Sequence, residues 1–189
     1  MTQTTNGVVA ATKRCDNTSV GILIHDDQGR LLVFNRATLP WGAAPPAGHI
    51  DDHGSPEQAA TAEVSEEVGL TVDSLELIAR RWRDNRCRRA DGPQGVGHEW
   101  FIYRAEVHGE LAPSPRETRN ARWLTAGELQ VLSLRTALYA YGDITEAEWQ
   151  HEPGIEPVWV LFLSMAGLIT AHREDLAAIE DTAAGQVRA

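Results

Sequence analysis

Two kinds of residue pattern follow each other along the chain. Runs of β-branched and aromatic residues predict strands at residues 18–25, 30–35, 71–82 (one or two strands) and 98–107. Patterns typical of helices occupy residues 55–69, 129–141, 145–150 and 157–181. The turn signal Asp26-Asp27-Gln28-Gly29 separates the first two runs, so we expect these strands to form a hairpin. At 189 residues, the chain is long enough to bury one sizeable core.

The clearest helix signal lies between Ser55 and Gly69. Ser55 is a good N-cap, Pro56 suits the first helical position, and Gln58 completes a capping box. Gly69 stands where a left-handed residue would end the helix. An apolar stripe recurs every fourth residue, at Ala60, Val64 and Val68. The stripe predicts which face of this helix packs on the core.

Glu63 and Glu67 are four residues apart, so their carboxylates lie side by side at the border of the stripe. Glu66 follows Glu63 by three residues and points further outward. Like charges at this spacing repel each other by roughly 0.2–0.5 kcal/mol per pair. A bound Mg²⁺ or Mn²⁺ ion, which prefers oxygen ligands, would offset that repulsion. The alternative interpretation is an acidic helix face exposed to solvent.

The surroundings of these glutamates have the register of a known motif. That motif, the Nudix box, reads Gly, five residues, Glu, seven residues, then Arg-Glu-apolar-x-Glu-Glu-x-Gly-apolar. Here Gly48 is followed at the matching distance by Glu63-Val64-Ser65-Glu66-Glu67-Val68-Gly69-Leu70. The chain therefore resembles a Nudix hydrolase, from about residue 19 to residue 129.

Two positions of the box differ from the family pattern. Gly54 stands where the family has its first Glu, and Ala62 stands where it has the Arg. In the family, that Arg helps to orient the glutamates. A replacement for the missing acid could come from Asp51, Asp52 or Glu57, and the sequence leaves the three open.

The resemblance implies an α/β fold, a Nudix-like α/β/α sandwich with a mixed curved sheet and a C-terminal helical extension. It also implies metal-dependent hydrolysis of a diphosphate linkage in a nucleoside di- or triphosphate or a nucleotide-linked small molecule. The alternative is a catalytically weak or inactive Nudix module that binds a nucleotide ligand for regulation. Gly54 and Ala62 are the residues that favour this alternative.

The resemblance further implies the residues of the site. The Mg²⁺ or Mn²⁺ ligands would be the Gly48 carbonyl, Glu63 and Glu67, with Glu66 and Glu117 as further candidates. Nudix proteins commonly place an acidic residue in a loop before a strand that ends in Trp, and Glu117 takes that place. The expected catalytic residues are Glu66, Glu67 and Glu117, and either Glu66 or Glu117 would be the general base.

An anionic substrate also needs positive charge, and the chain concentrates arginine in one place. Residues 80–89 contain six arginines and one Trp. Guanidinium groups bind phosphate bidentately and stack on rings. The alternative is a solvated loop. The residues expected to contact the substrate, a small phosphorylated molecule, are Arg36, Trp41, His49, Arg81 and Arg83.

Composition limits the partners and the location. A formal net charge of −10 argues against duplex nucleic acid, whose phosphates require clustered cations. Two cysteines give no disulfide framework and indicate a reducing, cytoplasmic location. The apolar run at residues 158–169 is too short to span a bilayer, so we expect no membrane partner. Without a C-x-x-C pair a zinc site lacks support, and convergence of Cys15, Cys87 and His98 is set aside.

The expected organisation has four parts: a flexible N-terminal arm at 1–16, a Nudix-like catalytic domain at 17–150, a helical extension at 151–181, and a flexible tail at 182–189. Residues 157–181 look like one long helix whose first half is apolar nearly all round. Such a helix is buried, either beneath the sheet or at a subunit interface. The second option predicts a homodimer.

Overall fold

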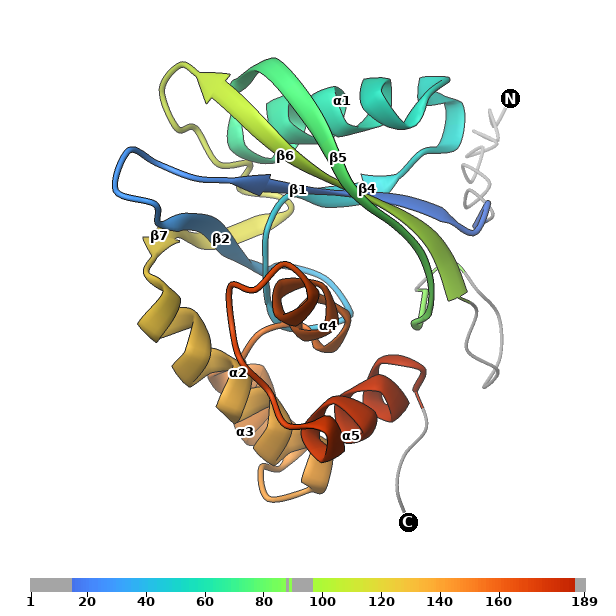
Figure 1. The fold of residues 1–189 in the computed structure, drawn as a ribbon, viewed down its shortest axis with the longest axis vertical. Coiled ribbons are helices and arrows are strands. Elements are labelled where there is room, and N and C mark those ends of the chain that lie inside the picture. The colour runs from blue at the N-terminus through green and yellow to red at the C-terminus, as the bar shows by residue number, and fades with distance from the viewer. Residues whose placement is uncertain (1–14, 88, 90–96, 186–189) are drawn as a thin grey trace, which may run out of the picture.

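The computed structural model describes residues 15–87, 89 and 97–185 (Figure 1). Its strands are β1 (Thr18–Ile24), β2 (Leu31–Arg36), β3 (Ala43–Ala44), β4 (Ala47–His49), β5 (Thr71–Asp84), β6 (Gly97–His108) and β7 (Thr118–Leu124). Its helices are the short η1 (Asp51–His53), α1 (Pro56–Val68), α2 (Ala126–Tyr141), α3 (Glu146–His151), α4 (Pro157–Met165) and α5 (Arg173–Ala183). The stretch predicted to hold one or two strands is a single strand, β5.

The strands form two sheets. Four lie in the order β4-β1-β6-β5, and three in the order β3-β2-β7. β1 runs parallel to β6 but antiparallel to β4, so the larger sheet is mixed. α1 covers one side of the strands, and α4 lies on the other side (Figure 1). The predicted α/β sandwich with a mixed sheet is confirmed.

Of the predicted hairpin of residues 18–25 and 30–35 only the turn forms, with hydrogen bonds from Asp26 N–H to Arg30 O and from Gly29 N–H to Asp26 O, and the strands do not pair beyond it. β1 and β2 belong to different sheets and are joined by an isolated bridge between His25 and Leu31. β4 pairs with β1 along the edge that a hairpin partner would need, and β6 pairs with its other edge. β2 therefore pairs with β3 and β7 instead.

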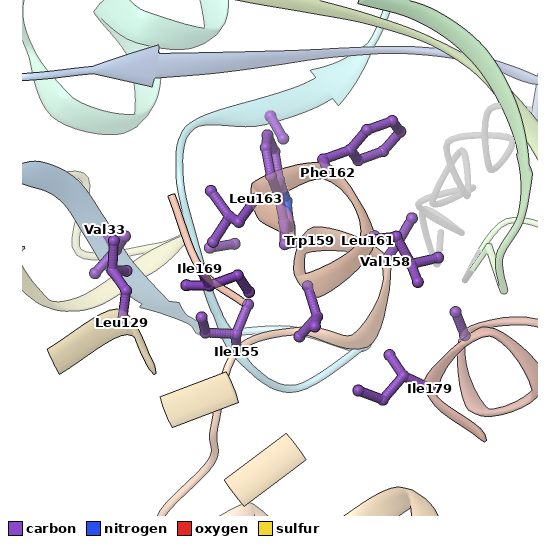
Figure 2. Packing of buried hydrophobic residues seen from close by; sticks show 14 of the residues in the cluster. Val33, Leu129, Ile155, Val158, Trp159, Leu161, Phe162, Leu163, Ile169 and Ile179 are labelled. Carbon is purple, nitrogen blue, oxygen red and sulfur yellow. The ribbon is translucent and has the colours of Figure 1, made fainter. Parts of the chain in front are cut away.

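Each side of the larger sheet has its own core. On one side, the apolar stripe of α1 is fully buried, with Ala60, Val64 and Val68 packed against residues of β1. On the other side, α4 carries the core, and Trp159 and Phe162 pack with their rings against Trp100 of β6. Figure 2 shows these α4 side chains among aliphatic residues of α2, α5 and β2. Both faces of β1 are thereby covered.

The predicted single helix at residues 157–181 is wrong. α4 ends at Met165, and α5 begins at Arg173. Between them Gly167 has φ +73°, a left-handed conformation that glycine adopts without strain. The turn lets the amphipathic α5 fold back against α2 and α4, with Ala178 and Ile179 buried. A continuous helix would have carried that apolar face away from the core.

The apolar surface of α4, which suggested a homodimer, lies in the core of the monomer. Every residue of α4 from Pro157 to Leu163 is buried in the monomer, beneath the sheet. The homodimer stays a prediction, but α4 cannot be its interface without unfolding this core.

α5 extends to Ala183, into the predicted tail. The predicted arm lies outside the described residues except for Cys15 and Asp16. Within the part of the chain that the structure describes, no helix is long and apolar enough to cross a membrane.

Candidate active site

α1 holds the glutamates of the box as its local sequence predicts. The Ser55 hydroxyl accepts the Gln58 backbone N–H, and the Gln58 side chain accepts the Ser55 N–H, which completes the capping box. Gly69 ends the helix with φ +73°. Both ends of α1 are thus fixed by local contacts, which sets the direction of each side chain along the helix.

Two carboxylates are held beside β4. Glu67 is 6% exposed and accepts a 2.9 Å hydrogen bond from the Ala47 backbone N–H. Glu63 lies directly over Gly48, where an added Cβ would stand only 1.7 Å from Glu63 Oε1. Any side chain at position 48 would displace this carboxylate, so the glycine leaves the space that Glu63 occupies.

Burial makes both carboxylates harder to ionise. Burial, with Glu66 and Glu117 nearby, raises the pKa of Glu63 to about 7. Burial and the neighbouring Glu63 raise the pKa of Glu67 well above its ordinary value. Two adjacent acids that resist ionisation fit a hard divalent cation, because its charge stabilises both carboxylates and oxygen is its preferred ligand. The residues present therefore fit the expected Mg²⁺ or Mn²⁺.

A second element brings Glu117 to the same place. The loop before β7 is attached to the end of α1 by hydrogen bonds from Ala112 N–H to Val68 O and from Ser114 N–H to Glu67 O. Its other end is attached to the chain after β2, where Ala37 N–H donates to Glu117 O. These contacts place Glu117 on the wall of a cavity of about 460 Å³. The cavity lining includes Arg36, Gly48, His49, Glu63, Glu66, Glu67 and Glu117.

Arg36 provides positive charge next to the buried acids. Its guanidinium lies 3.5 Å from the carboxylate of Glu156, which is 3% exposed. It also lowers the pKa of Glu63 and Glu67, against the larger effect of burial. Arg36 Nε and Glu156 Oε2 have no hydrogen-bond partner among the described residues. β2 thus places one cation near the glutamates of a box that has Ala62 where the family has an arginine.

The acids considered as substitutes at position 54 have other contacts. Asp51 forms an ion pair with Arg89 at 2.8 Å. Glu57 accepts hydrogen bonds from the hydroxyls of Ser55 and Tyr103. The side chain of Asp52 lies outside the described part of the structure.

The arginine-rich segment divides into two groups. Arg81 and Arg83 lie within β5 and are not among the residues that line the cavity. Arg81 is exposed, and Arg83 instead pairs with Glu180 at 3.0 Å and lies over the ring of Phe162. Arg86 and Arg89, which follow the strand, do line the cavity. The end of β5 at Asp84 is the feature that separates Arg86 and Arg89 from the arginines within the strand. Arg88 lies outside the described residues.

A second, larger cavity of about 680 Å³ adjoins the first. The two share lining residues, among them Pro40, Arg86 and Glu156. Trp41 lines the larger cavity rather than the carboxylate cavity. Tyr139 and Tyr141 of α2 and Trp149 of α3 complete the aromatic lining. These two helices therefore form one wall of a space next to the acids.

The convergence that the sequence analysis set aside does occur. Cys15, Cys87 and His98 meet, and His49 joins them. The spacing of these residues in the sequence gave no signal, because the strands bring them together from distant parts of the chain.

Comparison with known proteins identifies this architecture. A family model described as the NUDIX domain matches residues 16–145. The chain belongs to the Nudix family. An RNA pyrophosphohydrolase of Saccharophagus degradans is 33% identical over 119 residues, which are 57% of this chain and 70% of that protein. A putative 8-oxo-dGTP diphosphatase 3 of Mycobacterium tuberculosis is 30% identical over 138 residues, which are 71% of this chain and 57% of that protein.

Solved structures show the same fold. The MutT protein from Methanosarcina mazei superimposes with a TM-score of 0.51 at 17% identity, over 63% of this chain and 83% of that one. The resemblance found in the sequence is confirmed. The relatives also support the expected enzyme class, a Nudix-type pyrophosphohydrolase.

Proposed function

We propose that this Nudix protein hydrolyses a diphosphate linkage in a nucleotide, with Mg²⁺ or Mn²⁺ as cofactor. One observation carries the proposal. Glu63, against Gly48, and Glu67, bonded to the Ala47 N–H, lie on the wall of one cavity, where burial opposes their ionisation. A fold stabilised by packing alone gains nothing from two adjacent buried acids, whereas a cation site requires them.

The proposed roles follow from position. The Gly48 carbonyl, Glu63 and Glu67 would hold the cation, with Glu66 and Glu117 completing the acidic set. When bound, the cation would polarise a phosphoryl oxygen and lower the pKa of a coordinated water. Glu117 or Glu66 would accept the proton from the attacking water. Glu66 is exposed and Glu117 half-buried, so both are open to solvent in a way that Glu67 is not.

The larger cavity supports a nucleotide as substrate. A diphosphate beside the acids would point its attached group past Pro40 and Arg86 into a space lined by Trp41, Tyr139 and Tyr141. Aromatic side chains stack on a nucleobase at low entropic cost. In this arrangement Arg36 and Arg86 contact phosphates, and Trp41 contacts the base.

The names of the relatives suggest two substrate classes. The net charge of −10 disfavours long contact with an RNA backbone, so we place a free nucleotide first. RNA with a 5′ triphosphate is the second class to test, because its terminal nucleotide presents the same groups. The cytoplasmic location expected from the sequence stays a prediction.

The test is phosphate or pyrophosphate release from a panel of nucleoside triphosphates, nucleotide-linked diphosphates and 5′-triphosphorylated RNA, with and without Mg²⁺. Glu67→Gln serves as the matched inactive control. We expect Mg²⁺-dependent turnover on at least one member and none in the variant. Binding of a nucleotide without Mg²⁺-dependent turnover on the whole panel would instead establish the regulatory module, the alternative that Gly54 and Ala62 favour.

A further inference from the structure

Four potential metal ligands meet at one end of the larger sheet. Cys15 precedes β1, His49 ends β4, Cys87 follows β5, and His98 is the second residue of β6. In the order β4-β1-β6-β5, one ligand therefore lies on each strand or in the chain next to it. Because β4 and β5 run antiparallel to β1 and β6, two strand ends and two strand beginnings lie at this edge.

The distances match a tetrahedral site. Cys15 Sγ lies 3.5 Å from His49 Nε2 and 3.2 Å from His98 Nε2, and Cys87 Sγ lies 3.4 Å from His49 Nε2. All four ligand atoms lie within 4.8 Å of one another. Zinc bonds of about 2.3 Å to sulfur and about 2.0–2.1 Å to nitrogen place sulfur and nitrogen about 3.5 Å apart across a tetrahedron.

Hydrogen bonds could satisfy all of these contacts only by sharing one group between two partners. His49 Nε2 approaches both sulfurs, and a ring nitrogen carries either one proton or one lone pair in the ring plane. That one proton or lone pair would have to serve Cys15 and Cys87 together. A single cation at the centre would satisfy every contact at once.

The ring of His98 is fixed with its lone pair toward the sulfurs. Asn85 Oδ1 lies 2.8 Å from His98 Nδ1 and accepts the Trp100 indole N–H at 3.1 Å. The indole nitrogen only donates, so the Asn85 atom facing both rings is its oxygen. His98 Nδ1 therefore carries the proton, and Nε2 presents a lone pair toward Cys15. A buried carbonyl that orients a histidine in this way is typical of metal sites.

Backbone donors also favour thiolates. The Asn17 N–H donates to Cys15 Sγ at 3.3 Å, and the Arg89 N–H donates to Cys87 Sγ at 3.4 Å. Each donor follows its cysteine by two residues. Hydrogen bonds to the charged form stabilise it, and the thiolate is the form that binds metal.

We propose that Cys15, His49, Cys87 and His98 bind one zinc ion. Two thiolates and two neutral imidazoles are the donors that zinc takes in closed structural sites, and binding releases the two thiol protons. Four protein ligands leave no position for substrate, so the role is structural. This inference does not depend on the proposed hydrolase activity.

Such an ion would connect the two parts of the active site. His49 follows Gly48, and Cys87 lies between Arg86 and Arg89 at the cavity wall. Zinc would therefore fix the arginine-bearing segment against the strand that supports Glu63. It would also hold the chain before β1, since Cys15 precedes that strand.

The experiment is a metal analysis of the full chain, purified under reducing conditions from zinc-containing medium with no affinity tag. We expect about one zinc per chain, and replacement by Co²⁺ should give the visible absorption of a tetrahedral site with thiolate ligands. Zinc-free wild-type protein that gives no such spectrum with Co²⁺ would refute the site. A Cys15–Cys87 disulfide in place of the metal, in a parallel preparation purified without reductant, would refute it equally. These measurements need no variant to fold.

Variants then locate the ion. Cys87→Ser and His98→Gln should each lower zinc content about tenfold or more, because the remaining ligands are too few. His108→Gln is the matched control, since it changes the other histidine of β6, which pairs with Asp73 at the far end. Glu67→Gln should keep its zinc, which separates this site from the carboxylate cavity. Full zinc content in Cys87→Ser and His98→Gln would place the ion elsewhere and overturn the proposal.

Discussion

At the scale of single residues, the site depends on acids placed where water is scarce. Glu67 is the most enclosed of the four glutamates and has one backbone donor. The neighbouring Glu63 raises the pKa of Glu67, and its own carboxylate fits over Gly48 because that residue has no side chain. Their ionisation should therefore be sensitive both to substitution and to pH.

Glu67→Gln should abolish most activity without unfolding the protein. The variant keeps the size of the side chain but removes the charge that holds the cation, which supplies several kcal/mol to the transition state. Since each 1.36 kcal/mol is a tenfold change in rate, we expect kcat to fall at least about 100-fold. The melting temperature without Mg²⁺ should stay equal or rise, because a buried acid is removed. Glu110→Gln, an exposed substitution, is the control for both measurements.

The pKa of Glu63 predicts a pH-dependent stability in the absence of Mg²⁺. Burial raises this pKa from the ordinary 4.5 to about 7, so the folded state holds the proton more tightly than the unfolded state. The resulting stabilisation is complete below about pH 4.5 and is lost as the pH rises through about 7. The difference in melting temperature between wild type and Glu63→Gln should therefore change over this range. Parallel curves across it would contradict the assignment, and added Mg²⁺ should reduce the effect.

At the scale of elements, one arginine-rich segment performs two different tasks. In β5, Arg80 and Arg83 form surface ion pairs with Glu99 and Glu180. After β5 ends, Arg86 lines both cavities. Composition cannot separate these groups, because the charge is the same and only the strand boundary differs.

Arg86→Ala should therefore raise KM more than Arg81→Ala. Loss of a guanidinium that contacts phosphate removes a charge-assisted hydrogen bond of about 1.5–3 kcal/mol, so we expect KM to rise about tenfold or more. Arg81→Ala, an exposed change outside the cavity, should alter KM less than about twofold. Steady-state kinetics on the substrate identified by the panel gives both values. Equal effects at the two positions would show that only general charge matters.

At the scale of the whole molecule, the Nudix part and the helical extension share one core. Residues from β1 and β6, such as Leu23 and Ile102, pack in the same buried cluster as Trp159 and Phe162 of α4. The predicted boundary at residue 150, between a catalytic domain and a helical extension, stays a prediction. Physically, removing the segment beyond it would expose one face of the larger sheet.

A chain that ends at Gln150 should therefore fail to fold. It would lose the buried side chains of α4, each of which contributes roughly 1.5–3 kcal/mol, against a total stability of about 5–15 kcal/mol. Circular dichroism on heating should show no cooperative transition, and limited proteolysis should degrade the chain. A chain that ends at Gly185 is the control and should melt like the full-length protein. A cooperative transition in the shorter chain would show that the Nudix part is independent.

Local residue patterns are enough to predict α1, its caps, its buried stripe and the register of the Nudix box. These features depend on residues within a few positions of one another, and local spacing specifies them. Residue patterns also indicated β1, β2, β5 and β6, but not the short β3 and β4, and not that β2 would pair in another sheet than β1.

Contacts between segments that are far apart in the sequence became visible only in the folded structure. The contacts of Cys15 with His49 and His98 span 34 and 83 residues, and the one between His49 and Cys87 spans 38. Sheet register sets such contacts, and no local pattern encodes which strand ends become neighbours. For a similar reason the sequence left open whether the apolar helix α4 lies beneath the sheet or at a subunit interface, because that choice depends on contacts with distant segments.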